Sequence, residues 1–208
     1  KTLIDSSNMT VAYWNLLLEE LSKVYDGHKW PMLDYDAFII LHGTDTMSFT
    51  ASVLSFAIEN LNKTIILTGA QSIQLLKFST ISETRNDSIN NLLCSLVIAG
   101  HFTIPEVLVV FDNQLLRGNR SKKRSTSSLT SFYCPNFQNI GTFGLTIKIH
   151  WKRIIPVKEE KAKVNFVKLT EKVANIKLTP GVPTIPSEKY VVIESFGCGN
   201  MPMSGILH

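Results

Sequence analysis

The sequence has little cysteine, with only Cys94, Cys134 and Cys198 among 208 residues. Their spacing matches no metal-ligand motif and their odd number gives no complete set of disulfides, so we expect no metal site and a reducing compartment. No segment reaches the ~18 consecutive apolar residues that a membrane span needs. A charged and apolar leader is also missing from the start of the sequence. These absences predict a cytoplasmic protein that does not contact a membrane.

Positive charge exceeds negative charge only slightly, because the net charge is +4 at pH 7. Much of it comes from Lys122-Lys123-Arg124 and from a lysine-rich segment between Lys158 and Lys172. A basic surface can bind nucleic acid. The lysine-rich segment alternates lysine with glutamate, however, which favours a solvated linker. We therefore predict no nucleic-acid partner.

Short apolar runs alternate with amphipathic stretches over the first half of the chain. Apolar residues make up 44% of the sequence, enough for a core of useful size. Alternating strands and helices with short apolar strands predict an α/β fold, with a parallel sheet covered on both faces. The expected helices are 10–25, 47–61 and 86–99, and the expected strands are 38–41, 64–68, 107–111 and, near the end, 190–194.

The most informative stretch is His42-Gly43-Thr44-Asp45-Thr46-Met47, which joins the apolar run 38–41 to the following helix. In open α/β sheets ligands bind at the carboxyl ends of the strands, so hydroxyls and a carboxylate at this junction are candidate site residues. Ser, Thr and Asp are also common helix N-caps. On residue chemistry alone, the junction could therefore be a helix cap and nothing more.

The same stretch resembles the second signature of the L-asparaginase family, in particular its cytosolic type I and animal members. Other segments are similar to family segments in the same order along the chain. They are Asp5–Thr10, Leu67–Gln71, Ile104–Val107, Arg117–Arg120, Cys134–Asn136 and Phe196–Asn200.

The resemblance implies a fold and an activity. The expected architecture is a flavodoxin-like parallel sheet domain at residues 1–146 that lacks its first strand, a linker at 147–172 and the beginning of a smaller α/β domain at 173–208. The implied reaction converts L-asparagine to L-aspartate and ammonia without a cofactor. The implied assembly is a homodimer or homotetramer.

The resemblance also implies a catalytic group. A Thr hydroxyl is too weak an acid to attack an amide unaided, so a base must lie within hydrogen-bond reach, and a lysine of lowered pKa can be that base. Thr44 is implied as the nucleophile or water-activating hydroxyl, Asp45 as the carboxylate that orients it and contacts the substrate amine, and Lys123 as the base. Lys122 is one residue out of register and is the alternative.

Further residues match substrate contacts of the family. Ser6 and Ser7 match the loop that holds the α-carboxylate and α-amine, where hydroxyls can both donate and accept hydrogen bonds. Gly43 belongs to the same site, and Asn200 matches a Gly-x-Gly-Asn corner that reaches a neighbouring subunit's site. His42 receives a packing or hydrogen-bonding role.

Two departures from the family pattern leave alternatives open. The first family signature, Thr-Gly-Gly-Thr-Ile, carries another catalytic Thr and should precede Asp5, so we expect the complete protein and not this fragment to be active. Residues 72–86 are longer than the family's link and are either an insertion or a faulty gene model, although Asp87 and Asn91 match the motif that follows. An inactive asparaginase-like interaction module, or an archaeal-type transamidosome subunit, which shares the signature, stays an alternative.

Overall fold

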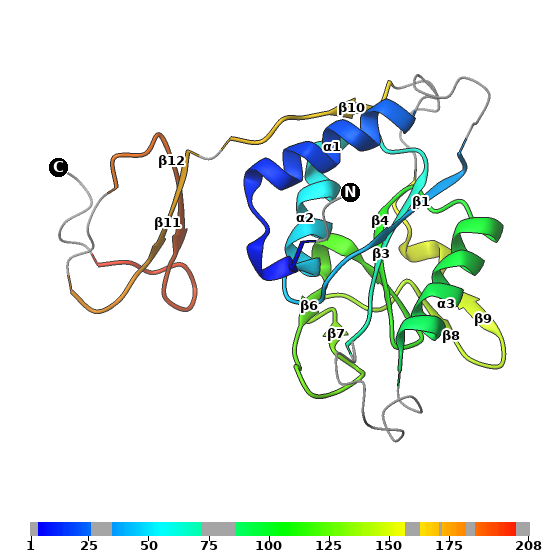
Figure 1. The fold of residues 1–208 in the computed structure, drawn as a ribbon. Helices are drawn as coiled ribbons and strands as arrows, with labels where there is room; N and C mark the ends of the chain where they lie inside the picture. Colours follow the sequence, from blue (N-terminus) through cyan, green and yellow to red (C-terminus); the bar gives the residue numbers. More distant parts are fainter. Residues whose placement is uncertain are drawn as a thin grey trace. The chain divides into compact units, whose positions relative to one another are not determined.

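The computed structural model describes residues 4–25, 35–71, 86–156, 163–170, 172–181 and 186–202. The chain forms two compact units, Lys1–Lys168 and Leu169–His208, and the two are described separately. Among the described residues, the first contains a six-stranded sheet with three α-helices, and the second contains a pair of strands (Figure 1).

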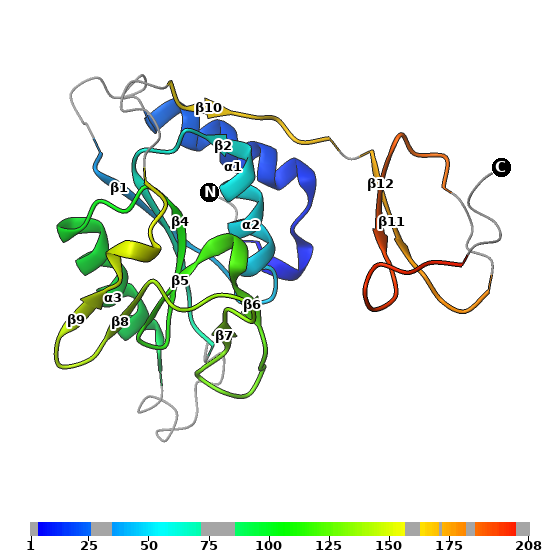
Figure 2. The same cartoon turned by 180° about the vertical axis from the view of Figure 1, so that it is seen from behind.

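The sheet of the first unit has a parallel half and an antiparallel half (Figures 1 and 2). Strand β3 pairs in parallel with β1 on one side and β4 on the other, as the alternation of elements predicts. Strands β5, β8 and β9 continue the sheet antiparallel from β4, which the sequence pattern did not predict. The strand bounds are β1 Ala37–Leu41, β3 Thr64–Thr68, β4 Val107–Phe111, β5 Gln114–Arg117, β8 Gly141–Phe143 and β9 Ile147–Ile149.

A tight turn starts the antiparallel half. Asp112 and Asn113 join β4 to β5, and their φ angles are 46° and 58°. Positive φ at both central residues is the geometry of the two-residue hairpin turns that suit twisted strands, and Asp and Asn adopt it more readily than other non-glycine residues. The chain therefore reverses directly after β4 instead of entering another helix.

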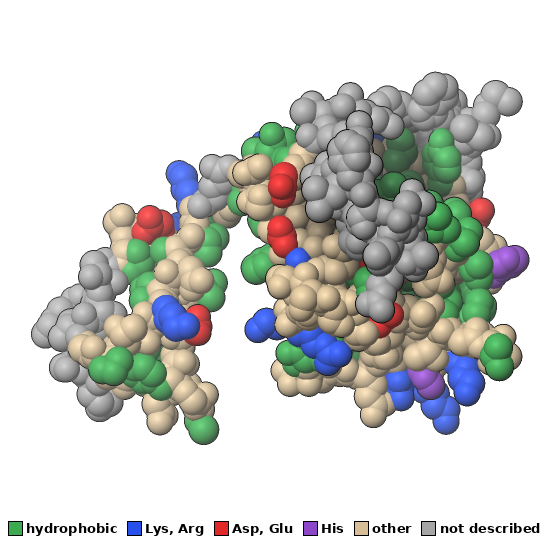
Figure 3. All heavy atoms as spheres, turned by 60° about the horizontal axis from the view of Figure 1, so that its bottom comes forward, with side chains coloured by type: hydrophobic (Ala, Val, Ile, Leu, Met, Phe, Trp, Pro, Cys, Tyr) green, Lys and Arg blue, Asp and Glu red, His purple; other side chains and the backbone are tan. Residues whose placement is uncertain are grey.

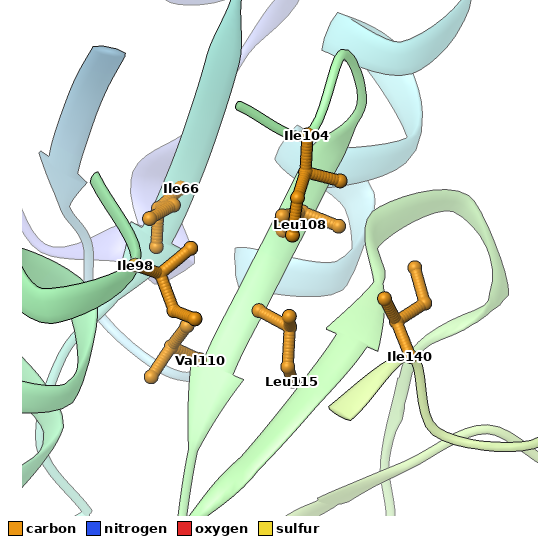
Figure 4. Packing of buried hydrophobic residues seen from close by; sticks show 7 residues of the cluster. All are labelled: Ile66, Ile98, Ile104, Leu108, Val110, Leu115 and Ile140. Atoms are coloured by element: carbon orange, nitrogen blue, oxygen red, sulfur yellow. The ribbon is translucent and has the colours of Figure 1, made fainter. Parts of the chain in front are cut away.

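Three helices accompany the sheet: α1 Val11–Tyr25, α2 Met47–Ala57 and α3 Ser88–His101. Helices α2 and α3 follow β1 and β3, and α2 lies behind the sheet in the view of Figure 4, on the face opposite to α3. Helix α2 ends at Ala57, four residues before the predicted Leu61. Ile58–Glu59 forms β2 and pairs with β10, Asn165–Phe166. This pairing partner lies about a hundred residues away, so no local pattern revealed it.

One hydrophobic cluster of the first unit lies between the sheet and α3 (Figure 4). Ile98 of α3 packs over β3 and β4, and β5 and the residue before β8 extend the cluster. All five residues of β3 and all five of β4 are buried. The members of the cluster are Ile66, Ile98, Ile104, Leu108, Val110, Leu115 and Ile140.

The predicted linker at 147–172 overlaps the first unit. Ile147–Ile149 is β9, which pairs with β8, and the short 3₁₀ helix η4, Trp151–Arg153, follows it. The first compact unit extends to Lys168. The chain in this region therefore includes the last strand of the sheet, and the pairing with β8 is what keeps it there.

The second unit contains β11, Val173–Lys177, and β12, Tyr190–Glu194, paired in parallel. A tight turn follows β12, where the Phe196 N–H donates to the Asn200 carbonyl at 3.1 Å. Gly197 and Gly199 within this turn have φ angles of 30° and 97°, which favour glycine. The predicted strand at 190–194 is confirmed.

On the face that Figure 3 shows, Lys and Arg side chains lie in separate groups among neutral ones. Within the parts of the chain that the structure describes, no helix has the length and apolar character that crossing a membrane requires.

Candidate active site

Lys123 joins the two polar residues that follow β1. Its Nζ lies 2.8 Å from Thr44 Oγ1 and 2.7 Å from Asp45 Oδ1. The lysine side chain is only 15% exposed, whereas the Asp45 side chain is 59% exposed. The structure therefore brings a hydroxyl and a carboxylate together with an amine that lies 79 and 78 residues further along the sequence.

Strand geometry explains why Lys123 and not Lys122 reaches Thr44. The two lysines form β6, Lys122–Lys123, which pairs with β7, Phe132–Tyr133. Successive side chains of a strand point to opposite sides. Lys122 is exposed and Lys123 is partly buried. The pairing with β7 thus fixes which of the two amines turns towards Thr44.

The 3₁₀ helix η1, Ser6–Asn8, lies against the Thr44 loop from the other side. The Thr46 hydroxyl donates to the Ser6 carbonyl at 2.6 Å. A Cβ atom on Gly43 would stand 2.6 Å from Ser6 Oγ, so only glycine allows this approach. Ser6 is 6% exposed and is brought next to the loop. Gly43 is therefore required by the close contact with Ser6.

Ser7 and Asn200 are placed differently from Ser6. Ser7 is exposed, and both its N–H and its hydroxyl donate to Asp5 Oδ1 at 2.9 Å. Asp5 is thereby the cap of η1. Asn200 belongs to the second unit, in the turn after β12. Within the first unit, the structure brings Ser6 against the Gly43 loop, whereas the Ser7 side chain is bonded to Asp5.

The hydrogen bond of Thr46 shows whether the junction after β1 is only a helix cap. It occupies the N-cap position of α2, but its side chain makes no capping hydrogen bond. Its hydroxyl donates to the Ser6 carbonyl instead. Thr44 Oγ1 and Asp45 Oδ1 both accept hydrogen bonds from the Lys123 amine. The interpretation of this junction as a simple helix cap does not account for these contacts.

A buried network connects the loops after β3 and β4. Asn91, fully buried, donates to the Gly69 carbonyl at 2.9 Å and accepts from the Asp112 N–H at 3.0 Å. The Asp87 carboxylate accepts from the Gln71 N–H at 3.0 Å. The sequence had marked Asp87 and Asn91 only as motif matches, and their role is to hold neighbouring strand ends together. The unusual segment 72–86 lies outside the described residues except for Asn86.

A buried ion pair supports the segment that leads to Lys123. Arg117 Nε lies 2.6 Å from Glu106 Oε2, and its Nη2 lies 3.0 Å from Glu106 Oε1. Both residues are buried, and the Arg117 guanidinium also stacks on Phe137. Arg117 directly precedes the 3₁₀ helix η3, Gly118–Arg120. The pair therefore fixes the end of β5, from which the chain turns towards β6. Sequence reasoning missed this pair because Glu106 precedes β4 and Arg117 ends β5, and the antiparallel pairing of these two strands was not predicted.

A cleft of about 540 Å³ adjoins the contact between Lys123 and Asp45. Its walls come from the first turns of α2 and from the segment between β5 and β6. Most of its side chains are hydroxyls, amides and cations, with one exposed aromatic ring. The lining residues are Asp45, Ser48, Phe49, Ser52, Asn119, Arg120, Ser121, Lys122, Lys123, Pro135 and Asn136. A polar molecule can thus reach Lys123 and Asp45 from this side.

Comparison with known proteins assigns this arrangement to a family. Residues 1–155 match the family model described as asparaginase, N-terminal. The chain belongs to the asparaginase family. The contacts of Lys123 with Thr44 and Asp45 lie inside the region that the asparaginase model matches, and Asn200 lies beyond it.

Individual asparaginase relatives cover nearly all of this chain. It is 39% identical to the human 60 kDa lysophospholipase over 96% of this chain and 34% of that protein. It is 34% identical to L-asparaginase 1 of Escherichia coli strain K12 over 97% of this chain and 57% of that protein. The crystal structure of L-asparaginase I from Vibrio cholerae superposes with a TM-score of 0.77 at 34% identity, covering 97% of this chain and 59% of that one. The chain thus spans between about a third and three fifths of these relatives.

No group of three or more His, Cys, Asp or Glu residues that could hold a metal ion occurs in the portion of the chain that is described. His42, directly before Gly43, has its pKa lowered, chiefly by burial. A neutral imidazole therefore stands at the end of β1.

Proposed function

We propose that the complete protein to which this sequence belongs is an L-asparaginase, which hydrolyses the side-chain amide of L-asparagine to L-aspartate and ammonia. The observation that carries the proposal is the position of Lys123 Nζ, within 2.8 Å of both Thr44 Oγ1 and Asp45 Oδ1. Membership of the asparaginase family supports it. An amine next to a hydroxyl is the pairing that an activated oxygen nucleophile needs.

Each residue of the group has a proposed role. In its neutral form Lys123 accepts the proton of the Thr44 hydroxyl as that oxygen attacks the amide carbon, or as a water held by the hydroxyl attacks it. The bond from carbon to nitrogen then breaks, and the proton passes from Lys123 to the leaving ammonia. Where Thr44 is the nucleophile, water next hydrolyses the ester and releases aspartate. Asp45 holds the amine of Lys123 in place.

Substrate binding follows from the same loop. Asp45 is largely exposed, so its carboxylate remains open to the ammonium group of the substrate. Ser6 presents its hydroxyl next to Gly43, where it can hold the substrate's α-carboxylate. The Thr44 N–H has no acceptor among the described residues and is available for the oxygen of the amide under attack. Ser7 and Asn200 are proposed as further contacts, the latter across a subunit boundary.

The proposal extends to assembly and location. We propose a cytoplasmic homodimer or homotetramer that needs no cofactor, since the family resemblance implies that Asn200 completes a neighbouring subunit's site. Size-exclusion chromatography with light scattering measures the assembly directly. A complete protein that stays monomeric and active would exclude the shared site.

The test is an assay of ammonia release from L-asparagine, with L-glutamine as the competing substrate. It is run on the complete protein and on the 208-residue chain in parallel. We expect turnover from the complete protein only, because the resemblance places a second catalytic Thr outside these residues. A folded complete protein that releases no ammonia would contradict the proposal and favour an inactive interaction module.

The name of the human relative supplies a second substrate for this assay. Because that protein is called a lysophospholipase, a lysophosphatidylcholine is offered under the same conditions and fatty-acid release is measured. We expect amide hydrolysis to depend on Thr44 and Lys123. Ester hydrolysis that survives their substitution would point to a site elsewhere in the complete protein.

A further inference from the structure

The side chain of His42 lies between the catalytic loop and two helices. Its Nδ1 is 2.7 Å from the Gly43 carbonyl oxygen, and its Nε2 is 2.8 Å from Thr50 Oγ1 on α2. The indole N–H of Trp14 on α1 donates to the same Thr50 oxygen at 2.9 Å. An unbroken chain of hydrogen bonds thus connects α1, α2 and the peptide that precedes Thr44.

The proton positions in this series of hydrogen bonds follow from its two outer groups, the Gly43 carbonyl and the Trp14 indole. A carbonyl oxygen only accepts, so His42 Nδ1 must carry a proton and donate to Gly43. The Trp14 indole only donates, so Thr50 Oγ1 accepts from it. With the His42 ring neutral and its proton on Nδ1, Nε2 has only a lone pair and accepts the proton of the Thr50 hydroxyl. Both ring contacts of His42 are therefore with uncharged groups. Burial of the ring favours the neutral imidazole that this pattern requires.

The backbone of His42 is held as firmly as its side chain. Its N–H donates to the Thr68 carbonyl at 2.8 Å, which continues the pairing of β1 with β3. A Cβ on Gly69 would stand 2.2 Å from the His42 carbonyl oxygen, so the two loops touch. With this residue fixed on both sides, its ring can set the orientation of the next peptide. That peptide contains the Gly43 carbonyl and the Thr44 N–H, which point in opposite directions.

We propose that His42 is a positioning residue for the reaction: its Nδ1–H holds the peptide between Gly43 and Thr44, and Thr50 with Trp14 keeps the ring in that tautomer. The inference rests on the proposed function and deepens it. His42 neither accepts the nucleophile's proton nor touches the substrate. It sets the direction of the Thr44 N–H and the place of the Thr44 hydroxyl before the substrate arrives.

A matched pair of substitutions separates the two ring nitrogens. His42→Asn keeps an amide nitrogen near the place of Nδ1, and His42→Gln keeps one near the place of Nε2. We expect kcat of the complete enzyme to fall on the order of 10-fold or more in His42→Gln, with KM changing less, because misplacing a reacting group costs rate more than binding. His42→Asn should keep most of the kcat of the wild-type enzyme. His101→Gln, at the exposed end of α3, is the control.

Thr50 gives an independent arm of the same test. Thr50→Ser keeps the hydroxyl, whereas Thr50→Val keeps the shape and removes both hydrogen bonds. We expect Thr50→Val to lower kcat and Thr50→Ser to preserve it. Equal kcat values in the Gln and Asn variants of His42, with Thr50→Val also unchanged, would overturn the proposal. Circular dichroism of each variant identifies any that fails to fold, and the serine and asparagine variants then decide.

Nuclear magnetic resonance tests the proposal without turnover. In the complete protein labelled with ¹⁵N-histidine, we expect His42 to be the neutral tautomer with its proton on Nδ1. With ¹⁵N-threonine, the Thr44 amide signal should shift in His42→Gln and much less in His42→Asn. A proton on Nε2, or a Thr44 signal indifferent to both substitutions, would refute the positioning role. Absence of ammonia release with these signals as expected would instead refute the proposed function alone.

Discussion

Two strands of similar sequence character have opposite environments. Strand β3 reads Thr-Ile-Ile-Leu-Thr and is buried at every residue, whereas β12 reads Tyr-Val-Val-Ile-Glu and is exposed at every residue. Strand β3 lies between two partner strands and under helices, while β12 pairs only with β11 among the described residues. An apolar run thus predicts that a strand forms, and its neighbours decide whether it is buried.

The difference in burial also distinguishes two loops, the Thr44 loop after β1 and the turn with Asn200 after β12, by how firmly each is held. The Thr44 loop follows a strand that is paired with β3, and buried contacts hold it at Ser6 and at His42. Asn200 follows β12, whose side chains face solvent. We infer that the first unit carries the chemistry and that the second contributes contacts, and four predictions can break or sharpen this contrast.

The largest expected effect is on turnover. Lys123→Met and Thr44→Val should each lower kcat of the complete protein by a factor on the order of 10² or more, because a base or nucleophile is removed. Lys122→Met is the matched control and should keep near-normal activity, since the amine that contacts Thr44 and Asp45 is that of Lys123. Ammonia release measures all three. Loss of activity in Lys122→Met alone would mean that β6 has the other register.

The next effect is on the stability of the first unit. Glu106→Gln leaves the Arg117 guanidinium buried without its carboxylate, which should cost about 3–5 kcal/mol in the free energy of unfolding. Urea denaturation of the complete protein measures it. The double variant Glu106→Gln with Arg117→Met should recover part of the loss, because neither charge is then buried alone. A single variant as stable as wild type would show that the pair does not support the end of β5.

The contrast between buried and exposed strands predicts unequal costs for similar truncations. Leu108→Ala in β4 removes side-chain atoms from the fully buried cluster and should cost about 2–5 kcal/mol. Ile193→Ala in β12, where the side chain is 41% exposed, should change the free energy of unfolding by less than about 1 kcal/mol. Urea denaturation of both variants tests this. A large cost at Ile193 would reveal that the complete protein covers β12.

The smallest effect is a pH dependence from His42. Burial lowers the pKa of this imidazole in the folded state below its ordinary 6.5, so the unfolded chain binds the proton more readily. Folded stability should therefore fall as the pH drops below about 6.5, because the unfolded state gains the proton first. His42→Asn removes the titration, so its unfolding free energy should decline less over the same range. Parallel curves for the two proteins would contradict the assigned pKa shift.

How much the sequence predicted depends on how local the cause is. Apolar runs found β1, β3, β4 and β12, and residue type marked the Thr44 loop. The sequence did not predict the antiparallel half of the sheet, although Asp112-Asn113 is a turn signal that could have been used. No local sequence pattern could predict the pairing of β2 with β10, because the two strands are about a hundred residues apart.

The candidate site divides in the same way. Thr44 and Asp45 follow from one contiguous stretch, and Lys123 was placed by its register in a resembling loop. The hydrogen bonds from Trp14 through Thr50 to His42 depend on how α1 and α2 pack, which no spacing in the sequence encodes. For His42, the prediction from the sequence was a packing or hydrogen-bonding role, without the partners of its ring.

Strand β6 lies within three consecutive cations, Lys122, Lys123 and Arg124. A slip of its pairing with β7 by one residue would turn Lys122 or Arg124 inward in place of Lys123. A positively charged side chain would then still face Asp45, and the fold as a whole would change little. With arginine inward the proposed proton transfer from Thr44 would stop, because a guanidinium cannot give up its proton at ordinary pH and so cannot act as the base. This short strand is therefore a place where a folding error could leave a well-formed protein that is chemically silent.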